Sequence, residues 1–311
     1  MKIVTDFDAI KAKHTAITVG TFDGLHLGHN MLIRELGRLA QELRTTSIVF
    51  TFEPHPRKVL KLNDEKLKML NTLDEKIWLL NQFPLDYLFL FPFTTEFAQM
   101  SYDSFVKDIL IDRLHMKYLI VGYDNHFGRN REGDSFKLKQ LAQTLDFQIF
   151  DVEAFTQDEI TISSTKLRRL LEAGDVRSAN NYLTLPYAIH GEIVKGNQLG
   201  RTISFPTANV AVAEQEKLIP GDGVYAVLIQ IGADVYKGML NIGHRPTIKS
   251  SIIQKIMEVH ILNFDGDIYG AKVRITFIDR IRNEQKFDSL QHLKAQLTKD
   301  KQQALTILDN M

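Results

Sequence analysis

The chain has no cysteine, one tryptophan and 8 prolines among its 311 residues. The absence of cysteine excludes disulfides, thiolate catalysis and cysteine-ligated zinc, and it suits a reducing compartment. Lysine plus arginine and aspartate plus glutamate both number 38, so no net charge attracts nucleic acid or an anionic membrane. No apolar run is as long as a membrane span, and residues 1–6 lack the apolar region of a signal peptide. We therefore expect a cytoplasmic protein with no nucleic-acid or membrane partner.

The pattern of apolar residues predicts two domains, since 311 residues are many for one core. In the first half, short apolar runs alternate with helix-length segments such as 64–80 and 102–114; the runs are 16–20, 47–52, 87–91, 118–122 and 148–152. This alternation predicts an α/β domain with a parallel sheet, whose ligands bind beyond the carboxyl ends of the strands.

From residue 186 the pattern becomes β-rich, with runs at 188–194, 223–230, 235–240, 257–263 and 271–281. Glycine, asparagine, aspartate and proline break these runs, which predicts an antiparallel barrel or sandwich. A final amphipathic helix follows, with Asp288 or Ser289 as its cap. We expect domains at 1–184 and 186–311.

The segment 17–29, ITVGTFDGLHLGH, joins the predicted strand 16–20 to an amphipathic helix. Its glycines let the backbone approach a ligand, and a helix N-terminus offers unpaired N–H groups to phosphate. His26 and His29 can donate hydrogen bonds to phosphoryl oxygens as charge moves onto them. Half of a metal site is the alternative, but no nearby set of histidine or carboxylate ligands completes it. The segment also supplies phosphate-binding candidates: Gly20, Phe22, Asp23 and Gly28.

Two further segments fall at the same predicted edge of the sheet. Asp124 and Phe127 follow the fourth strand, where acidic and aromatic groups suit a flat heteroaromatic substrate. His55, between Pro54 and Pro56, follows the second strand. His55 and Pro56 either help to close a pocket for this flat substrate or form an ordinary loop.

The segment 162–169, ISSTKLRR, places three hydroxyls before a helical run. Ser163, Ser164 and Thr165 could be simple helix caps. Together with Arg168 one turn later, they also suit an anionic group such as a pyrophosphate leaving group.

In the second half, a glycine-broken loop with Gly196, Gly200 and Arg201 offers donors to phosphates, although such loops are usually only hairpins. The neutral oxygens of Thr207 and Asn209 suit Mg²⁺ that shares nucleotide phosphates. Glu258 lies in an expected strand, where it is either part of a solvated face or, if that face is inward, a base for an attacking alcohol.

These motifs together resemble the prokaryotic bifunctional FAD synthetases. Residues 1–184 are similar to the FMN adenylyltransferase module in the histidine pair, the P-H-P turn, the G-x-D…F-G…G-D segment and S-S-T-x-x-R. Residues 186–311 are similar to the riboflavin kinase module in G-x-x-x-G-R, F-P-T-A-N, P-x-x-G-V-Y, N-I-G-x-x-P-T and D-x-Y-G. The chain departs from the family pattern at Asn125, His126 and Ser204.

The resemblance implies a Rossmann-like HxGH nucleotidyltransferase domain, followed by a six-stranded antiparallel barrel with a terminal helix. It implies Mg²⁺ and ATP ligation by Thr207 and Asn209, and Glu258 as the base for the ribityl hydroxyl. It also places Asn241 and Arg245 in a motif that we assign to flavin binding.

The implied function is ATP-dependent phosphorylation of riboflavin to FMN, then adenylylation of FMN to FAD with release of pyrophosphate. One alternative is a nucleotidyltransferase for another phosphate ester, with a barrel that only binds flavin. A second is a flavin-sensing regulator that binds nucleotides and RNA without catalysis. The balanced charge opposes RNA binding, and the intact histidine pair opposes lost catalysis.

Overall fold

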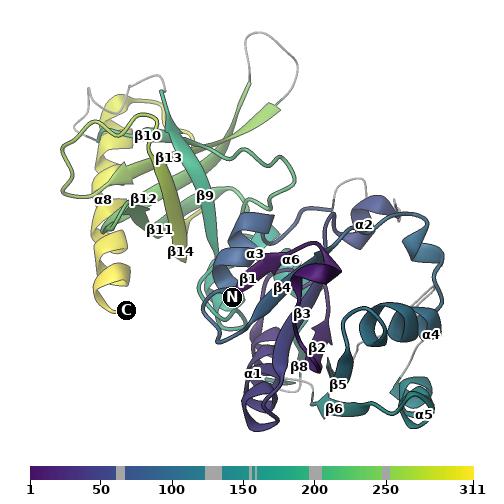
Figure 1. Ribbon diagram of the computed structural model, residues 1–311. Helices are drawn as coiled ribbons and strands as arrows, with labels where there is room; N and C mark the ends of the chain where they lie inside the picture. The colour runs from purple at the N-terminus through teal and green to yellow at the C-terminus, as the bar shows by residue number, and fades with distance from the viewer. Residues whose placement is uncertain (61–66, 123–134, 154–155, 158–159, 196–204, 247–252) are drawn as a thin grey trace. The chain divides into compact units, whose positions relative to one another are not determined.

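The computed structural model describes residues 1–60, 67–122, 135–153, 156–157, 160–195, 205–246 and 253–311 (Figure 1). They form two compact units. The N-terminal unit comprises Met1–Leu67 and Leu73–Ser163, and the C-terminal unit comprises Lys68–Thr72 and Ser164–Met311. The predicted domain boundary near residue 185 stays a prediction. The compact C-terminal unit begins earlier in the sequence, at Ser164, so residues 164–184 belong to the same unit as the barrel. None of the helices in these ranges has the length and apolarity needed to cross a bilayer.

The N-terminal unit contains a six-stranded parallel sheet in the order β1-β4-β3-β2-β5-β6. Its strands are β1 (Lys2–Val4), β2 (Thr15–Val19), β3 (Thr46–Phe52), β4 (Tyr87–Phe91), β5 (Met116–Gly122) and β6 (Gln148–Val152). The five strands predicted from apolar runs are confirmed. The short, largely exposed β1 gave no such signal and extends the sheet beside β4.

Helices cover both faces of this sheet, as alternating side chains of buried parallel strands require. Val49 of β3 belongs to a buried cluster with Leu36 of α1, whereas its neighbour Phe50 belongs to another with Phe105 and Leu138. The helices are α1 (Leu27–Glu42), α2 (Pro56–Val59), α3 (Leu73–Leu80), α4 (Tyr102–Ser104), a π-helix (Phe105–Ile111), α5 (Ser135–Leu145) and two 3-10 turns (Phe7–Ala9, Phe97–Gln99). A two-stranded sheet of β7 (Thr156–Gln157) and β8 (Ile160–Thr161) completes the unit.

The strand order places a topological switch point between β2 and β5. From β2 the chain adds β3 and β4 on one side, and it then returns to add β5 and β6 on the other. Connections leave such a point in opposite directions, which opens a crevice at the carboxyl ends of the strands. The histidine-pair segment follows β2 directly, so the fold puts it at this crevice.

The predicted helix at 64–80 is wrong for residues 67–72. Met69 forms a parallel bridge with Lys217: its N–H donates to the Glu216 carbonyl at 2.7 Å, and its carbonyl accepts from Leu218 N–H at 2.8 Å. The buried Lys217 ammonium donates to the Leu70 carbonyl at 2.6 Å. These long-range bonds compete successfully with local helix propensity, so α3 begins only at Leu73.

The C-terminal unit contains a closed six-stranded barrel in the order β10-β13-β12-β11-β14-β9, with antiparallel neighbours throughout. Its elements are α6 (Ser164–Glu172), α7 (Val176–Asn180), β9 (Ala188–Val194), β10 (Ala208–Ala211), β11 (Gly223–Ile231), β12 (Asp234–Pro246), β13 (Ile253–Ile261), β14 (Lys272–Arg282) and α8 (Leu290–Asp309). The barrel and the final helix are confirmed, with Ser289 as the cap that accepts from His292 N–H at 3.2 Å.

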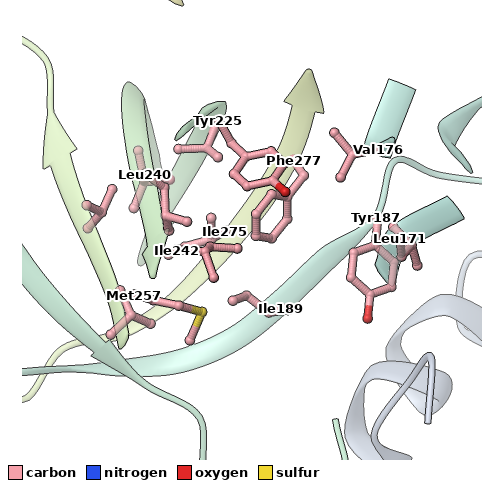
Figure 2. Packing of buried hydrophobic residues seen from close by; sticks show 14 of the residues in the cluster. Leu171, Val176, Tyr187, Ile189, Tyr225, Leu240, Ile242, Met257, Ile275 and Phe277 are labelled. Atoms are coloured by element: carbon pink, nitrogen blue, oxygen red, sulfur yellow. The ribbon is translucent and has the colours of Figure 1, made fainter. Parts of the chain in front are cut away.

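Strand residues of this barrel alternate between two buried clusters. The larger cluster takes residues from all six strands and fills the interior, where the rings of Tyr225 and Phe277 meet edge to face at 5.4 Å (Figure 2). The smaller cluster combines Met239 of β12 with Ala304 and Leu308 of α8. Helix α8 therefore covers part of the outer face of the barrel (Figure 1).

Candidate functional site

The turn between β2 and α1 has a constrained backbone. Phe22, Gly24 and Leu25 all have positive φ angles, of 48°, 89° and 38°. Such angles are uncommon outside glycine and often mark functional turns. His26 caps α1, because its Nδ1 accepts the His29 backbone N–H at 3.3 Å. Since Nδ1 accepts, a neutral His26 carries its proton on Nε2.

The two imidazoles lie against each other at the N-terminus of α1. Their ring centroids are 3.7 Å apart with an interplanar angle of 15°, and the Phe22 ring meets His29 edge-on at 5.2 Å. The enclosed Nδ1 of His29 has no hydrogen-bond partner among the described residues. Burial, then the neighbouring His26 and then Lys76, holds the pKa of His29 well below its ordinary value. His29 is therefore a neutral donor near pH 7 rather than a cation.

The other predicted residues of this segment have different surroundings. Gly20 leaves room for the Phe22 ring, since a Cβ there would lie 3.0 Å from Cζ of Phe22. Asp23 is buried at 2% exposure, and Gly28 lies half-buried in the first turn of α1.

His55 also caps a helix. Its Nδ1 accepts the Arg57 backbone N–H at 3.2 Å, and Pro56 occupies the first turn of α2. The Nδ1 atom of His55 therefore helps to stabilise the start of α2. The flavin contacts of His55 and Pro56 stay predictions. Asp124 and Phe127 lie outside the described residues.

The hydroxyl-rich segment begins α6 as predicted, at Ser164. Ser163 and Ser164 are half-buried, Thr165 is exposed, and Arg168 is buried at 7% exposure. The Arg168 Nε donates to the Lys68 carbonyl at 2.8 Å, which ties α6 to the segment Lys68–Thr72. A bond to a carbonyl 100 residues earlier has no local signal in the sequence.

In the C-terminal unit, three predicted residues form one row across adjacent strands. Asn209 of β10 pairs with Glu258 of β13, and Glu258 pairs with Asn241 of β12. Directly paired residues project from the same face of a sheet. All three are half-buried. The row brings together an amide, a carboxylate and a second amide.

The row lies on the outer face of the barrel, because the alternate residues Met257 and Val259 belong to the interior cluster. The inward orientation considered for Glu258 is therefore wrong. His260 shares this outer face, and its ring nitrogen lies 2.7 Å from the Pro206 carbonyl, next to Thr207. Burial lowers the pKa of His260, and the charge of Lys301 on α8 lowers it further. Met239, the cross-strand partner of His260, clusters with Ala304 of α8, so α8 lies near this face.

Gly196, Gly200 and Arg201 lie outside the described residues, as do the departures at Asn125, His126 and Ser204, and the side chain of Arg245. Within the described ranges, no group of three or more histidine, cysteine, aspartate or glutamate side chains could hold a metal ion. Thr207 and Asn209 offer oxygen ligands of another kind, a hydroxyl and an amide.

Sequence reasoning missed Lys76 of α3, which is only 4% exposed and whose charge acts on His29. It also passed over Glu53, which follows β3 and whose charge acts on Lys76. One feature of the sequence could have indicated that Lys76 is buried: it follows Glu75 and is itself followed by the apolar residues 77–80. A lysine in such a helix is usually assigned to the solvent face.

Two protein families match this chain, one over its N-terminal half and one over its C-terminal half. Residues 8–166 match the family described as FAD synthetase, and residues 183–308 match the family described as riboflavin kinase.

Curated relatives cover nearly the whole chain. A bifunctional riboflavin kinase/FMN adenylyltransferase from Haemophilus influenzae is 37% identical over 286 residues, covering 92% of this chain and 91% of that protein. A protein of the same name from Bacillus subtilis is 35% identical, covering 96% and 93%. A crystal structure titled as a macrolide-efflux protein from Streptococcus pneumoniae matches with a TM-score of 0.87 and 30% identity, covering 97% of each chain.

Proposed function

Because this chain belongs to the family of bifunctional riboflavin kinases/FMN adenylyltransferases, we propose that its barrel phosphorylates riboflavin and its parallel-sheet domain adenylylates FMN. The chain is a transferase that uses ATP in both steps. The observation that carries this conclusion is the pair of family matches, one over each half, combined with relatives of the same double activity. We assign adenylylation of FMN to residues 1–184 and phosphorylation of riboflavin to residues 186–311.

For the kinase step we assign the base to Glu258, because its half-buried carboxylate lies between two amides on the outer face of the barrel and so does not need the inward orientation. Its carboxylate takes the proton of the terminal ribityl hydroxyl, whose oxygen attacks the γ-phosphorus of ATP. The bond from that phosphorus to the bridging oxygen breaks, and ADP leaves. Asn241, the cross-strand neighbour of Glu258, is available to contact the flavin, and Arg245 lies further along β12.

The row of paired residues also fits a Mg²⁺ ion. Mg²⁺ prefers a few oxygen ligands together with waters and nucleotide phosphates. Asn209 supplies an amide oxygen directly beside Glu258, and Thr207 supplies a hydroxyl two residues earlier. Thr207 and Asn209 would hold the ion, which neutralises phosphate charge when bound.

For the second step we assign charge stabilisation to His26 and His29. A phosphate oxygen of FMN attacks the α-phosphorus of ATP, and the bond to the pyrophosphate oxygen breaks. This nucleophile is already ionised near pH 7, so the step needs donors and positioning rather than a base. A neutral His29 and a His26 whose proton lies on Nε2 are suited to donate hydrogen bonds to phosphoryl oxygens.

The remaining assignments are also proposals. We assign ATP or phosphate contacts to four residues of the segment 17–29 and to three more in the sequence before β10; they are Gly20, Phe22, Asp23, Gly28, Gly196, Gly200 and Arg201. We assign pyrophosphate binding to the start of α6, at Ser163, Ser164, Thr165 and Arg168. We assign flavin contacts to His55, Pro56, Asp124 and Phe127, and we place the enzyme in the cytoplasm.

Incubation of the purified chain with riboflavin, ATP and Mg²⁺, followed by chromatographic separation of the flavins, tests the proposal. We expect FMN first and then FAD, with both steps abolished by a chelator of Mg²⁺. Accumulation of FMN without FAD would contradict the second step, and unchanged riboflavin would contradict the first.

A further inference from the structure

Helix α3 contains a buried lysine that none of the motifs includes. Lys76 is only 4% exposed. Lysine is almost never fully buried unless its ammonium group is paired, because removing the charge from water is costly. Burial lowers the pKa of Lys76, while the carboxylates of Asp23 and Glu53 favour its charged form and the charge of Lys58 opposes it.

These groups come from four elements whose buried side chains share one cluster, which contains Leu80 of α3, Phe22, Val49 of β3 and Leu36 of α1. Asp23 lies in the turn after β2, and Glu53 directly follows β3. Strands β2 and β3 are parallel, with Val19 opposite Phe50, so their carboxyl ends share an edge. The charge of Lys76 also acts on His29, in the first turn of α1. The ammonium therefore lies within electrostatic range of the histidine pair.

The charge balance of this cluster leaves a role for a cation. The pKa of His29 is lowered, so its ring can donate a hydrogen bond but carries no positive charge near pH 7. ATP brings several negative charges, and more negative charge moves onto the leaving group as the α-phosphorus bond breaks. A preorganised cation in a site shielded from water stabilises such charge more strongly than one in bulk solvent.

We propose that the Lys76 ammonium binds a phosphoryl oxygen of ATP and stabilises the charge that passes to pyrophosphate during adenylyl transfer. This inference rests on the proposed adenylyltransferase function of the N-terminal unit. Lys76 forms no covalent bond in the step. The competing interpretation is that Lys76 only neutralises Asp23 and Glu53 to stabilise the fold.

The first test compares Lys76→Met, which keeps the side-chain length without the charge, with Lys76→Arg and the exposed control Lys13→Met. Lys76→Met should lower kcat/KM for ATP in FAD formation from FMN by about 10- to 100-fold, as expected for a lost charged contact. It should weaken pyrophosphate binding, measured by isothermal titration calorimetry, by at least about 10-fold. Lys76→Arg should retain more FAD formation and more pyrophosphate affinity than Lys76→Met, and Lys13→Met should match the wild type in both.

The kinase step in the same chain serves as an internal control. Riboflavin phosphorylation should stay within about twofold of the wild type in Lys76→Met, because Lys76 belongs to the N-terminal unit and the kinase reaction is assigned to the barrel. Wild-type pyrophosphate affinity in a folded Lys76→Met variant would overturn the proposal, whatever happens to FAD formation. A wild-type chain that forms no FAD at all would instead contradict the adenylyltransferase function itself.

A second measurement keeps the proposal testable if Lys76→Met does not fold. The wild-type chain is labelled with ¹⁵N at the lysine side chains, and the Lys76 resonance is identified by its loss in Lys76→Arg. Addition of pyrophosphate should shift this resonance. Saturation with pyrophosphate without a shift at Lys76 would show that the ammonium does not contact the ligand.

Discussion

Replacement of Asp300 by asparagine should weaken the attachment of α8 to the barrel. Asp300 is 1% exposed, and its two carboxylate oxygens each lie 3.0 Å from Nε of Arg282. A third bond joins Arg282 Nη2 at 2.7 Å, and Gln296 donates at 2.8 Å. Removing one partner of a buried ion pair costs about 3–5 kcal/mol, since the other charge stays buried. The Arg282 side chain retains 18% exposure, so we expect a value near the lower end, about 3 kcal/mol.

Differential scanning calorimetry measures this loss. For a unit of this size, about 3 kcal/mol corresponds to a decrease of roughly 6–12 °C in the transition of the barrel. Asp309→Asn is a matched control, because Asp309 also joins α8 to the barrel, through Lys237, but both side chains are exposed. An exposed pair contributes at most about 1 kcal/mol. Equal decreases for the two variants would refute the argument from burial.

Three further predictions concern the two sites. His29→Ala should abolish FAD formation and spare FMN formation, and Glu258→Ala should do the reverse; chromatography of the products would contradict the assignment if either variant lost both. Gly20→Ala should displace the Phe22 ring from His29 and slow FAD formation by about 10-fold, with kinase activity unchanged as the control. Folding lowers the pKa of His29 below its ordinary value of 6.5. As the pH falls below 6.5, His29 is therefore protonated in the unfolded chain but not in the folded chain, which favours unfolding. Urea unfolding at pH 7.5 and 5.5 should therefore show the N-terminal unit losing up to about 1.4 kcal/mol per pH unit, and His29→Gln should lessen this loss.

Local patterns were sufficient to predict the turn that carries His26 and His29. A β-branched run, a glycine-rich turn and an amphipathic helix are each specified by neighbouring residues, and the structure has them in that order. The strands β2 to β6 and the terminal helix follow from local apolar patterns for the same reason. The exception at residues 67–72 arises because the bridge between Met69 and Lys217 joins segments far apart in the sequence.

Contacts between distant segments explain what the sequence did not reveal. The row Asn209, Glu258 and Asn241 depends on the register of three strands, which alternation alone does not fix. Whether that row faces inward depends on which alternate residues fill the barrel. Lys76 is buried by tertiary packing, and the apolar residues 77–80 that follow it are only a weak local signal of this.

Mixing two variants that each lack one of the two activities tests most directly the claim that one chain carries two separate reactions. His29→Ala and Glu258→Ala are each incubated with riboflavin, ATP and Mg²⁺, first alone and then together. Alone, the first should stop at FMN and the second should leave riboflavin unchanged; together, they should form FAD, because FMN made by one variant is adenylylated by the other. Failure of the mixture to form FAD, while Glu258→Ala converts added FMN to FAD and His29→Ala makes FMN, would contradict two independent sites linked by free FMN.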